Sequence, residues 1–350
     1  MGWYEINQRD LPWRRNQDPY SIWVSEIMLQ QTRVAVVIDR HKAFLERFPT
    51  ITSLAAATEQ EVLALWSGLG YYRRARMLYK AAQFLAENLE GKLPESSPEL
   101  LKLPGIGAYT AAAIASIAHG ERVAVVDGNV ERVLCRVAGW DASGTEGRAD
   151  LRRRIQKLAD HLVDPRRPGD FNQATMELGA TVCLPRNPRC LACPIAAHCT
   201  TRGEHKTAPR ARMLRRDIAH ALCIRERGGG CEVLLEQRAA SHSVMPGLWE
   251  LPSLSEALVP DEHLRMTVRH AIMQVNYYVR IRTVQEGDMH ALERAAGQRR
   301  WVGVEELGTM ALTGLARKVL TRAHLLASAL NPRAKNRPAP PSGGRVFARN

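Results

Sequence analysis

The feature that most constrains this chain is a run of four cysteines within seventeen residues, Cys183, Cys190, Cys193 and Cys199. The gaps between them are six, two and five residues. Paired disulfides would be an unusual use of four thiols in so short a loop. A metal centre bound by the four thiolates would instead hold the loop in one conformation. Structural zinc sites usually combine two CxxC pairs, and only one such pair occurs here. The spacing therefore favours a 4Fe-4S cluster, with a zinc site that includes His198 as the main alternative.

The start of the chain carries no targeting pattern. Met1 is followed by neither a basic segment nor an apolar one, so no secretory signal is expected. No segment approaches eighteen uninterrupted apolar residues, so no membrane span is expected either. These patterns predict a cytoplasmic protein, associated with the nucleoid in a bacterial-type cell. Cys135, Cys223 and Cys231 are then expected to be free thiols.

The charge of the chain indicates the kind of partner. There are 49 Lys and Arg residues against 36 Asp and Glu, a formal net charge of +13. Arginine suits bidentate contacts with phosphate, and an excess of this size goes beyond what solubility needs. We therefore expect a nucleic acid partner. A basic enzyme with no nucleic acid partner remains the alternative, because charge describes association rather than fold.

Hydrophobic periodicity predicts a helical domain over residues 1–200. Apolar residues recur there at three- and four-residue spacing. The sequence Ser97-Pro98-Glu99 is typical of a capped helix start. The expected helices are Ser21–Gln30, Arg33–Phe48, Glu59–Trp66, Arg73–Asn88, Pro98–Leu101, Tyr109–Ala118, Asn129–Val137, Asp150–Leu162 and Asn172–Ala180.

The pattern changes after residue 200. A basic linker is expected over 201–217, followed by a smaller α+β domain over 218–330. Its expected strands are Ile218–Ile224 and Glu232–Gln237, joined through a Gly-rich turn, and Gln274–Val284, with a final helix at Ala311–Leu330. The tail 331–350 has five basic residues, no acids and four prolines, so it is expected to be disordered.

A helix-hairpin-helix motif is predicted at Leu103-Pro-Gly-Ile-Gly107, which precedes an Ala-rich helix. Gly105 and Gly107 would allow a tight turn to present backbone N–H groups to a phosphate at the start of the next helix. A simple packing turn between two helices is the alternative.

Two carboxylates are candidates for catalysis. Asp127 follows the apolar, strand-like run Val123–Val126, and Asn129 lies two residues later. From the local sequence alone, Asp127 reads as a turn residue and Asn129 as a helix cap. Glu26 lies midway along an apolar helix; most such residues are solvated, but apolar surroundings would raise its pKa.

Six segments together resemble one family. They are SEIMLQQTRV (25–34), WSGLGYYRRAR (66–76), LPGIGAYTAAAI (103–114), VDGNVERV (126–133), FNQATMELGATVC (171–183) and PGLWELP (246–252). This combination is similar to the MutY family of adenine DNA glycosylases, in the helix-hairpin-helix superfamily. The resemblance implies a mainly α fold, a helix-hairpin-helix glycosylase domain with an iron-sulfur loop, plus a Nudix-like α+β domain for lesion recognition. It extends over residues 3–252 and weakens beyond them.

The resemblance also implies an activity and a partner. Such enzymes flip adenine out of duplex DNA in which it is mispaired with 8-oxoguanine or guanine, and cleave its glycosidic bond. Protonated Glu26 would be the general acid, and ionised Asp127 would stabilise the oxocarbenium ion, supported by Tyr109 and Asn129. A monomer bound to DNA is expected, with no membrane partner.

Further residues take their expected roles from the same resemblance. Arg14, Trp13 and Gln173 would line the base pocket, and Gln31, Leu69 and Tyr71 would contact the opened DNA. In the C-terminal domain, many members have a Phe-Ser-His turn whose serine contacts 8-oxoguanine. Here the matching stretch is Ile272-Met273-Gln274, so Met273 offers no hydroxyl, and Gln274 and Thr32 remain to contact the lesion.

Three alternatives remain at this point. An endonuclease III-like lyase would need a lysine two residues after the second hairpin glycine, where this chain has Tyr109. A Nudix-type nucleotide hydrolase would need a metal-binding acidic helix after Gly247, which is absent from the sequence. A non-catalytic lesion-binding protein would not need both Glu26 and Asp127.

Overall fold

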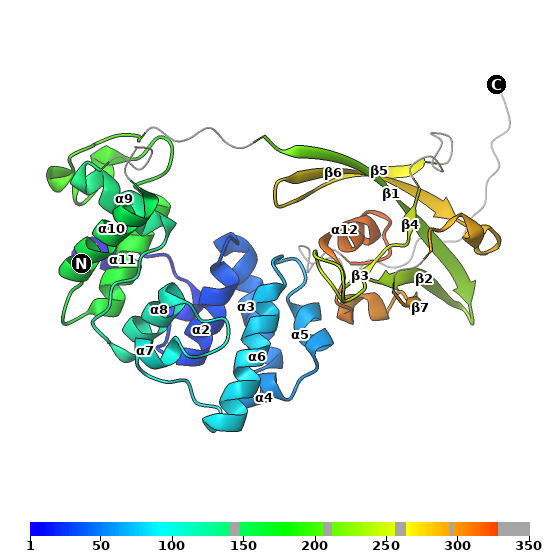
Figure 1. Ribbon diagram of the computed structural model, residues 1–350, viewed down its shortest axis with the longest axis horizontal. Coiled ribbons are helices and arrows are strands. Elements are labelled where there is room, and N and C mark those ends of the chain that lie inside the picture. Colours follow the sequence, from blue (N-terminus) through cyan, green and yellow to red (C-terminus); the bar gives the residue numbers. More distant parts are fainter. Residues whose placement is uncertain (141–146, 206–211, 256–263, 295–296, 328–350) are drawn as a thin grey trace. The chain divides into compact units, whose positions relative to one another are not determined.

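The computed structural model describes residues 1–140, 147–205, 212–255, 264–294 and 297–327. The chain divides into two compact units, Met1–Leu214 and Arg215–Asn350. The first is helical and the second is built on a β-sheet (Figure 1). The tail 331–350, expected to be disordered, lies outside the described residues. Among the described residues, no helix combines the length and apolar character that a membrane span requires.

The helical unit contains every helix that the periodicity predicts. Its helices are α1 (Gly2–Asn7), α2 (Pro19–Leu29), α3 (Val34–Arg47), α4 (Ile51–Ala55), α5 (Glu59–Leu65), α6 (Arg73–Asn88), α7 (Ser97–Leu100), α8 (Ala108–His119), α9 (Gly128–Ala138), α10 (Arg148–Leu162) and α11 (Pro168–Thr181). The short helices α1 and α4 were not predicted. Helix α11 begins four residues before its predicted start, where Pro168 occupies the first turn.

Helix α2 forms the centre of this unit. Asp18 caps it by accepting hydrogen bonds from the backbone N–H groups of Tyr20 and Ser21. Every residue from Tyr20 to Met28 is buried, so α2 is covered on all sides. The ordinary alternative for such a residue, a solvated helix position, therefore does not hold for Glu26, because other elements cover the helix that carries it.

Two local predictions in this unit are wrong. Residues 123–126 form no strand; the side-chain amide of Asn172 pairs with Val125 N–H and the Val123 carbonyl, where a neighbouring strand would be needed. Helix α7 has Ser96 rather than Ser97 as its N-cap residue. The Ser97 N–H and hydroxyl instead donate to the Glu121 carboxylate, at 2.6 and 2.7 Å.

The second unit contains a sheet with strand order β3-β2-β1-β6-β5, in which β4 pairs with β1 and β7 with β2. The strands are β1 (Leu214–Arg227), β2 (Gly230–Gln237), β3 (Trp249–Glu250), β4 (Ser253–Leu254), β5 (Leu264–Ile272), β6 (Val275–Val284) and β7 (Arg299–Gly303). Helix α12 (Gly314–Arg322) packs Leu315, Val319 and Leu320 into the core beside the sheet (Figure 1).

Turn chemistry sets the strand ends in this unit. Gly228 and Gly229 have φ of +60° and +79° and close the β1–β2 hairpin, as that tight turn requires. Strand β1 starts at Leu214, so the last residues of the predicted linker 201–217 belong to the sheet. Of the predicted final helix Ala311–Leu330, α12 covers Gly314–Arg322 among the described residues, and 328–330 lie outside them.

The β5–β6 hairpin turns at Met273 and Gln274, because Ile272 pairs with Val275. The strand predicted from Gln274 therefore starts one residue later. Met273 is 75% exposed and has a φ of +53°, a conformation that favours glycine. Strands β3, β4, β5 and β7 were not predicted.

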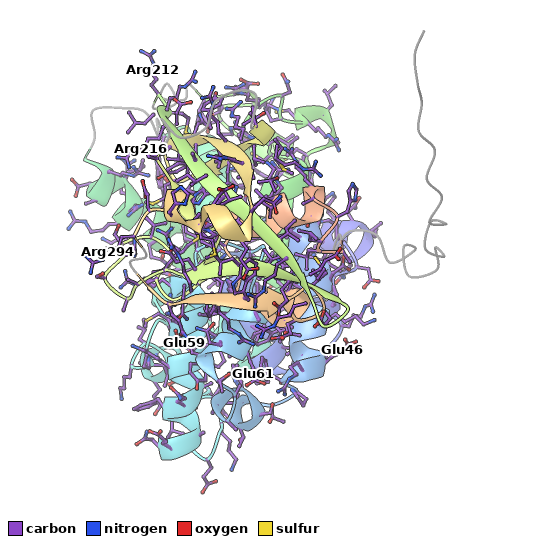
Figure 2. All side chains as sticks on the ribbon, turned by 90° about the vertical axis from the view of Figure 1, so that its right-hand side faces the viewer. Glu46, Glu59, Glu61, Arg212, Arg216 and Arg294 are labelled. Carbon is purple, nitrogen blue, oxygen red and sulfur yellow. The ribbon has the colours of Figure 1, made fainter. Side chains whose placement is uncertain are left out.

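Charged side chains project from both units. Figure 2 shows Arg212 and Arg216 extending outward near the start of β1. On the helical unit, Glu59 and Glu61 of α5 pair with Arg76 and Arg47, at 2.9 and 2.6 Å. These acids and arginines compensate one another in pairs, so the formal net charge of +13 comes from other basic residues.

Candidate active site

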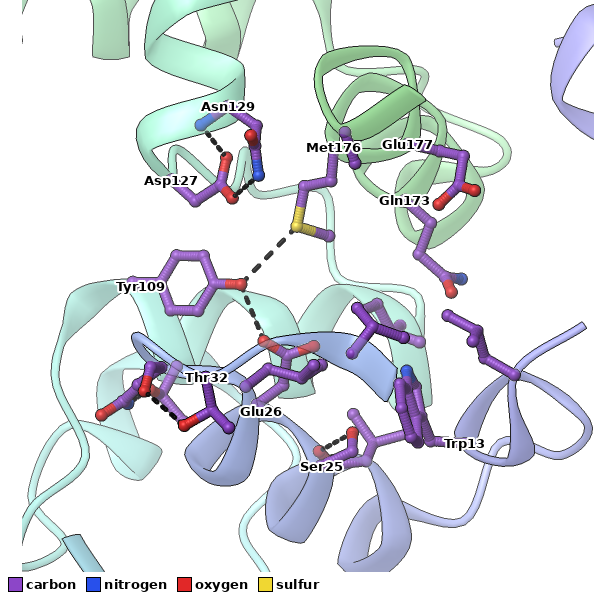
Figure 3. A pocket seen from close by; sticks show the side chains of 18 of the residues that line it. Trp13, Ser25, Glu26, Thr32, Tyr109, Asp127, Asn129, Gln173, Met176 and Glu177 are labelled. Atoms are coloured by element: carbon purple, nitrogen blue, oxygen red, sulfur yellow. Dashed lines mark hydrogen bonds between the residues drawn. The ribbon is translucent and has the colours of Figure 1, made fainter. Parts of the chain in front are cut away.

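A cavity of about 690 Å³ opens in the helical unit (Figure 3). Its walls come from α2, α8, α9 and α11, and from the segment before α2. The lining includes most of the residues expected to bind or cleave the substrate, which are Trp13, Arg14, Glu26, Gln31, Thr32, Gly107, Tyr109, Asp127, Asn129 and Gln173. Residues from four helices and from both ends of the unit therefore meet in one place.

Glu26 is a buried carboxyl group at the wall of this cavity. It is only 6% exposed, and Tyr109 Oη donates to its Oε2 at 2.7 Å. Burial raises the pKa of Glu26 to about 7. The Tyr109 hydrogen bond and the charge of Arg14 lower this pKa, and the charge of Asp127 raises it. A carboxyl with this pKa carries a proton in a large fraction of molecules near neutral pH.

Asp127 is held at the N-terminus of α9, as its sequence context predicts. Its Oδ1 accepts from the backbone N–H groups of Asn129 and Val130, at 2.8 and 2.7 Å. The Asn129 side-chain amide donates to Oδ2 at 2.8 Å (Figure 3). Three N–H donors and the positive end of the helix dipole suit a negatively charged group. Asp127 therefore caps α9 and also lines the cavity.

Tyr109 lies between the two carboxylates. Its hydroxyl contacts Glu26 and also Met176 Sδ, which lies 3.6 Å away (Figure 3). Burial raises the pKa of Tyr109 well above its usual value, and the charges of Glu26 and Asp127 raise it further. The phenol therefore stays protonated, and its single proton can be donated to only one of the two neighbours at a time.

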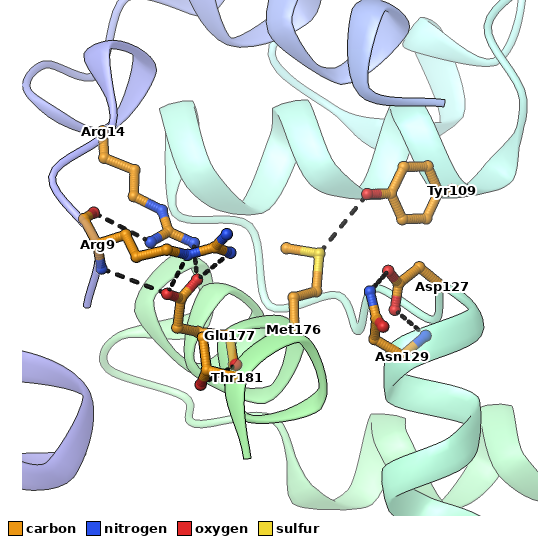
Figure 4. Close-up of polar contacts among 8 residues, drawn as sticks. All are labelled: Arg9, Arg14, Tyr109, Asp127, Asn129, Met176, Glu177 and Thr181. Atoms are coloured by element: carbon orange, nitrogen blue, oxygen red, sulfur yellow. Dashed lines mark hydrogen bonds and ion pairs between the residues drawn. The ribbon is translucent and has the colours of Figure 1, made fainter. Parts of the chain in front are cut away.

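A buried ion cluster forms the opposite wall. Glu177 of α11 has a fully buried side chain and accepts from Arg9 Nε at 2.6 Å and from Arg14 Nη2 at 2.9 Å (Figure 4). Burial alone would raise the pKa of Glu177, but its hydrogen bonds to the two arginines and their charges outweigh burial and lower it. Arg14 is thus fixed by Glu177, and it also donates to the Arg9 carbonyl.

The remaining pocket residues come from two directions. Trp13 is buried, and its ring makes an edge contact with the ring of His41, with centroids 5.3 Å apart. Gln173 lies one turn before Glu177 on α11 and faces the cavity (Figure 3). Trp13, Arg14 and Gln173 are therefore together, as expected from the sequence.

Asn129 is itself held from behind by Arg132. Arg132 Nη2 donates to Asn129 Oδ1 at 2.9 Å and to the Gly179 carbonyl at 2.7 Å, while its Nε donates to the Cys183 carbonyl at 2.8 Å. A Cβ atom built on Gly179 would lie 2.6 Å from Asn129 Cβ. Only glycine allows α11 to approach α9 this closely.

The four cysteines of the predicted metal centre follow α11 directly. Cys190 begins the short 3₁₀ turn Cys190–Ala192 and Cys193 directly follows it, while Cys199 directly follows a second turn, Ala196–His198. All four are half-buried free thiols. Burial raises the pKa of Cys193, and the nearby thiols of Cys183, Cys199 and Cys190 raise it further, so the four lie close together. Arg136 Nη1 contacts Cys183 Sγ at 3.3 Å.

The chemistry of these thiols fits an iron-sulfur cluster. Among the described residues, no three His, Cys, Asp or Glu side chains are placed to share one metal ion. The donor set consists of sulfur only, in one loop, which is the set that iron-sulfur clusters use. Cys183, Cys190, Cys193 and Cys199 are the residues that would hold such a group.

The residues expected to contact DNA occupy three loops of the helical unit. Gln31 and Tyr71 are exposed and have positive φ, +55° and +48°. Leu69 is buried beside them, and the Thr32 hydroxyl lies 3.4 Å from the Leu69 carbonyl. In the predicted hairpin, Gly105 has a φ of +76° and packs against Met77, whereas Gly107 caps α8 and has open space at its Cβ position.

Met273 and Gln274 are in the other unit, at the tip of the β5–β6 hairpin. They do not line the cavity. Their place on an exposed turn leaves them accessible to a large ligand, but nothing in the sheet unit assigns them a role.

The chain is similar to several known proteins. Residues 24–161 match the family model described as HhH-GPD superfamily base excision DNA repair protein. The chain is 40% identical over 332 residues to the human adenine DNA glycosylase, covering 78% of this chain and 59% of that protein. It is 49% identical over 208 residues to the rat adenine DNA glycosylase, covering 57% and 40%. The chain is thus similar over most of its own length to adenine DNA glycosylases.

Further comparisons extend this similarity. The adenine DNA glycosylase of Arabidopsis thaliana is 38% identical over 315 residues, covering 78% of this chain and 49% of that protein. Among solved structures, a thermostable thymine-DNA glycosylase matches 57% of this chain and 92% of its own, at 28% identity and a TM-score of 0.52. The chain thus spans about 40% to 59% of the length of these three curated relatives.

Four residues that contact the site were missed from the sequence. They are Arg9, Arg132, Met176 and Glu177, all of which contact residues of the cavity. A signal for Glu177 was present, since it lies four residues after Gln173 and so shares a helix face with it. No local pattern marks Arg9, whose partner Glu177 is 168 residues away, and Arg132 bonds to Asn129 nearby but also to the distant Gly179 and Cys183 carbonyls.

Proposed function

We propose that the chain is a monofunctional adenine DNA glycosylase that acts on duplex DNA and removes adenine mispaired with 8-oxoguanine or guanine. The observation that carries this proposal is the carboxyl of Glu26, buried with a pKa of about 7 in the same cavity as the helix-capping carboxyl of Asp127. Glycoside hydrolysis uses two carboxyl groups whose pKa values are set apart by their environments.

The first step uses Glu26 as an acid. Its proton passes to N7 of the flipped adenine, the bond between N9 and C1′ breaks, and the base leaves with the bond's electron pair as neutral adenine. Protonation makes a poor leaving group a good one. Tyr109, which keeps its own proton, holds the Glu26 oxygen at 2.7 Å and so directs the acid.

The second step uses both carboxylates. Asp127 stabilises the positive charge that develops on the sugar, because its orientation is already fixed by the three N–H donors of α9. Glu26, now ionised, accepts a proton from a water molecule whose oxygen bonds to C1′. The products are free adenine and an abasic site, and Glu26 is protonated again.

The absence of an amine supports a hydrolytic rather than a lyase mechanism. A lyase would form a Schiff base between a lysine and C1′. Among the described residues, no lysine lines the cavity, and the phenol of Tyr109 occupies the position where the resemblance places the lyase amine.

Polar side chains that face the cavity would recognise the base. Arg14 and Gln173 face the cavity from two sides and would read the polar edge of adenine, with Trp13 as an apolar wall. On the opposite strand, Gln274 would contact the lesion from the β5–β6 turn. Because the Thr32 hydroxyl already contacts the Leu69 carbonyl and an arginine of α6, it has less capacity for a new partner.

We propose a 4Fe-4S cluster as the cofactor. When bound, it would cross-link four points of the loop after α11 through iron–thiolate bonds. Arg132 and Arg136, which bond to this loop, then hold it against α9. Iron and sulfide analysis of wild type and Cys193→Ser tests the assignment; one zinc per chain and no iron would refute it.

The activity is tested by single-turnover cleavage of adenine opposite 8-oxoguanine, guanine, cytosine and thymine. We expect an abasic product opposite the first two and little opposite the others. Borohydride should trap little covalent complex with wild type; efficient trapping together with strand cleavage would instead support a lyase.

The contact with the lesion is tested by the ratio of affinities for 8-oxoguanine:A and G:A duplexes in Met273→Ser and Gln274→Ala. A ratio that is unchanged in both variants would exclude this contact.

A further inference from the structure

One arginine outside the cavity connects two loops that are separate in the sequence. Arg74 lies in the first turn of α6, and its two Nη atoms lie within hydrogen-bond distance of six acceptors. Nη1 contacts the carbonyl oxygens of Ile27, Met28 and Gln30, at 2.7, 3.0 and 2.5 Å. Nη2 contacts Thr32 Oγ1 and the carbonyl oxygens of Leu69 and Gly70, at 3.1, 3.2 and 3.1 Å.

The setting of this cation is unusual, because none of these six partners is a carboxylate. Burial lowers the pKa of Arg74 to about 10, which still leaves it charged. Its compensation comes from carbonyl dipoles, three of them at the C-terminus of α2, where a positive charge is favourable. The guanidinium also lies over the rings of Trp66 and Tyr71, 5.4 and 5.5 Å from their centroids.

Both loops hold an exposed residue in a strained conformation. Gln31, between Gln30 and Thr32, has a φ of +55°, and Tyr71, directly after Gly70, has a φ of +48° and is 49% exposed. Such conformations persist only where the surrounding structure holds them. The Arg74 bonds fall on the residues adjacent to Gln31 and Tyr71. Trp66 Nε1 adds a second bond to the Gly70 carbonyl, at 3.1 Å.

We propose that Arg74 is a positioning residue that joins the Gln30–Thr32 and Leu69–Tyr71 loops into one rigid wedge for opening the DNA duplex. This inference rests on the proposed function, because it concerns how the target base is flipped. A wedge that is already ordered loses little conformational freedom when it enters the base stack. Arg74 itself touches neither the cavity nor the reacting atoms.

Lysine cannot replace the guanidinium in this role. Arginine presents four Nη hydrogens in one plane, directed to both sides, and here they reach both loops. A lysine ammonium is a single point with three donors, so it can contact one loop but cannot span the two. Arg74→Lys therefore keeps the charge and removes the connection, and Arg74→Gln removes both.

Hydrogen exchange tests the wedge in the full-length protein without DNA. The amides of Thr32 and Leu69 bond to the Leu29 and Trp66 carbonyls, so they report the order of the two loops. We expect them to exchange at least tenfold faster in Arg74→Lys and Arg74→Gln, with amides inside α2 and α6 unchanged. Arg76→Gln is the matched control, since Arg76 lies in the same helix and pairs with Glu59 instead.

Base flipping is the second measurement. A duplex with 2-aminopurine at the target position becomes more fluorescent when that base leaves the stack. In a Glu26→Gln background, which cannot cleave, we expect Arg74→Lys to reduce this increase at least fivefold at saturating protein. With Glu26 intact, the excision rate should fall by a similar factor while the pH midpoint of the rate, which Glu26 sets, stays the same.

The outcomes separate this inference from the proposed function. If the loop amides of Arg74→Lys exchange their hydrogens at the wild-type rate, the inference is overturned. It is also overturned if they exchange faster but the fluorescence increase is normal. If wild type excises no adenine from any duplex, the proposed function fails, and the exchange data still show whether Arg74 joins the loops. If Arg74→Gln does not fold, Arg74→Lys carries both measurements.

Discussion

Glu26 is the residue on which the proposed chemistry depends most directly. Because it must be protonated to act as the acid and its pKa is about 7, the single-turnover rate should be level below pH 7 and fall about tenfold per pH unit above it. Glu26→Gln should lower the rate by about 10²-fold or more at every pH, since general acid catalysis is worth roughly 10²–10⁴. Glu46→Gln, at the surface, is the control. A Glu26→Gln enzyme that keeps a tenth of the rate would rule out this role.

The same carboxyl group should make stability depend on pH. Its pKa is about 7 in the folded protein and 4.5 ordinarily, so between these values the native state retains a proton that the unfolded state releases. Native stability from this group is therefore fully present below about pH 4.5 and is lost as the pH rises to 7, by on the order of 3 kcal/mol.

Substitution tests this pH dependence. Since glutamine is uncharged at every pH, Glu26→Gln should be more stable than wild type at pH 8 and close to it at pH 4.5. Urea unfolding at the two pH values measures the difference. An equal effect of the substitution at both would show that Glu26 is not held in a raised-pKa environment.

Glu177 should matter for both stability and base binding. Removing its charge leaves two guanidinium groups, Arg9 and Arg14, without their shared partner. Breaking a buried pair typically costs 3–5 kcal/mol; since Arg9 is 39% exposed and its charge is screened by solvent, we expect about 2–4 for Glu177→Gln. Glu90→Gln, which breaks an exposed pair with Lys92, should change the unfolding free energy by less than about 1 kcal/mol. An unchanged unfolding free energy for Glu177→Gln would mean that water molecules take the place of the Glu177 carboxylate as partner of the two arginines.

At the scale of elements, the distance between α9 and α11 depends on Gly179. The methyl group of Gly179→Ala would lie 2.6 Å from Asn129 Cβ, so the helices must separate and the Asn129 amide must move relative to Asp127. We expect the excision rate to fall by about tenfold or more, because small displacements of positioning groups have effects on the order of 10²-fold.

The control for this change is Gly2→Ala, where an added Cβ meets nothing within 4 Å. Comparable duplex affinity for Gly179→Ala and wild type would place the defect in the chemical step. A Gly179→Ala enzyme with a normal rate would show that α11 can shift without disturbing Asp127.

The helices were largely predictable because each has a one-sided apolar pattern or a capping residue. Helix α6, for example, begins and ends where its periodicity predicted. The short strands β3 and β4 could not be predicted, because two-residue strands exist only through their partners β1 and β2. For the site, the family resemblance predicted Glu26 and Asp127, but not the burial of Glu26, since that depends on how other helices cover α2.

At the scale of the whole molecule, the division into two units predicts an independent catalytic fragment. All cavity residues and all four cysteines of the proposed cluster lie within Met1–Leu214. A fragment of residues 1–214 should therefore fold, bind iron and excise adenine from A:G duplexes within about tenfold of the intact rate. Near-identical excision opposite 8-oxoguanine and guanine is also expected, because Met273 and Gln274 are removed.

Single-turnover rates of the fragment and the full chain provide the measurement. The matched control is an equimolar mixture of the fragment with residues 215–350. If covalent linkage is needed, this mixture should not restore the difference in excision rate between 8-oxoguanine and guanine as the opposite base. A folded, iron-containing fragment without activity would show that the sheet unit contributes to the chemistry itself.

The contact between Tyr109 and Met176 has a consequence for oxidative damage. A thioether sulfur is a weak acceptor, so the tyrosine proton can stay with Glu26. Conversion of Met176 to its sulfoxide would put a strongly polar oxygen at this place and draw the only phenolic proton away from the acid. A protein proposed to act on oxidised DNA thus carries, in its own catalytic pocket, an atom that the same oxidants attack, and methionine sulfoxide reductases would be needed to keep it working.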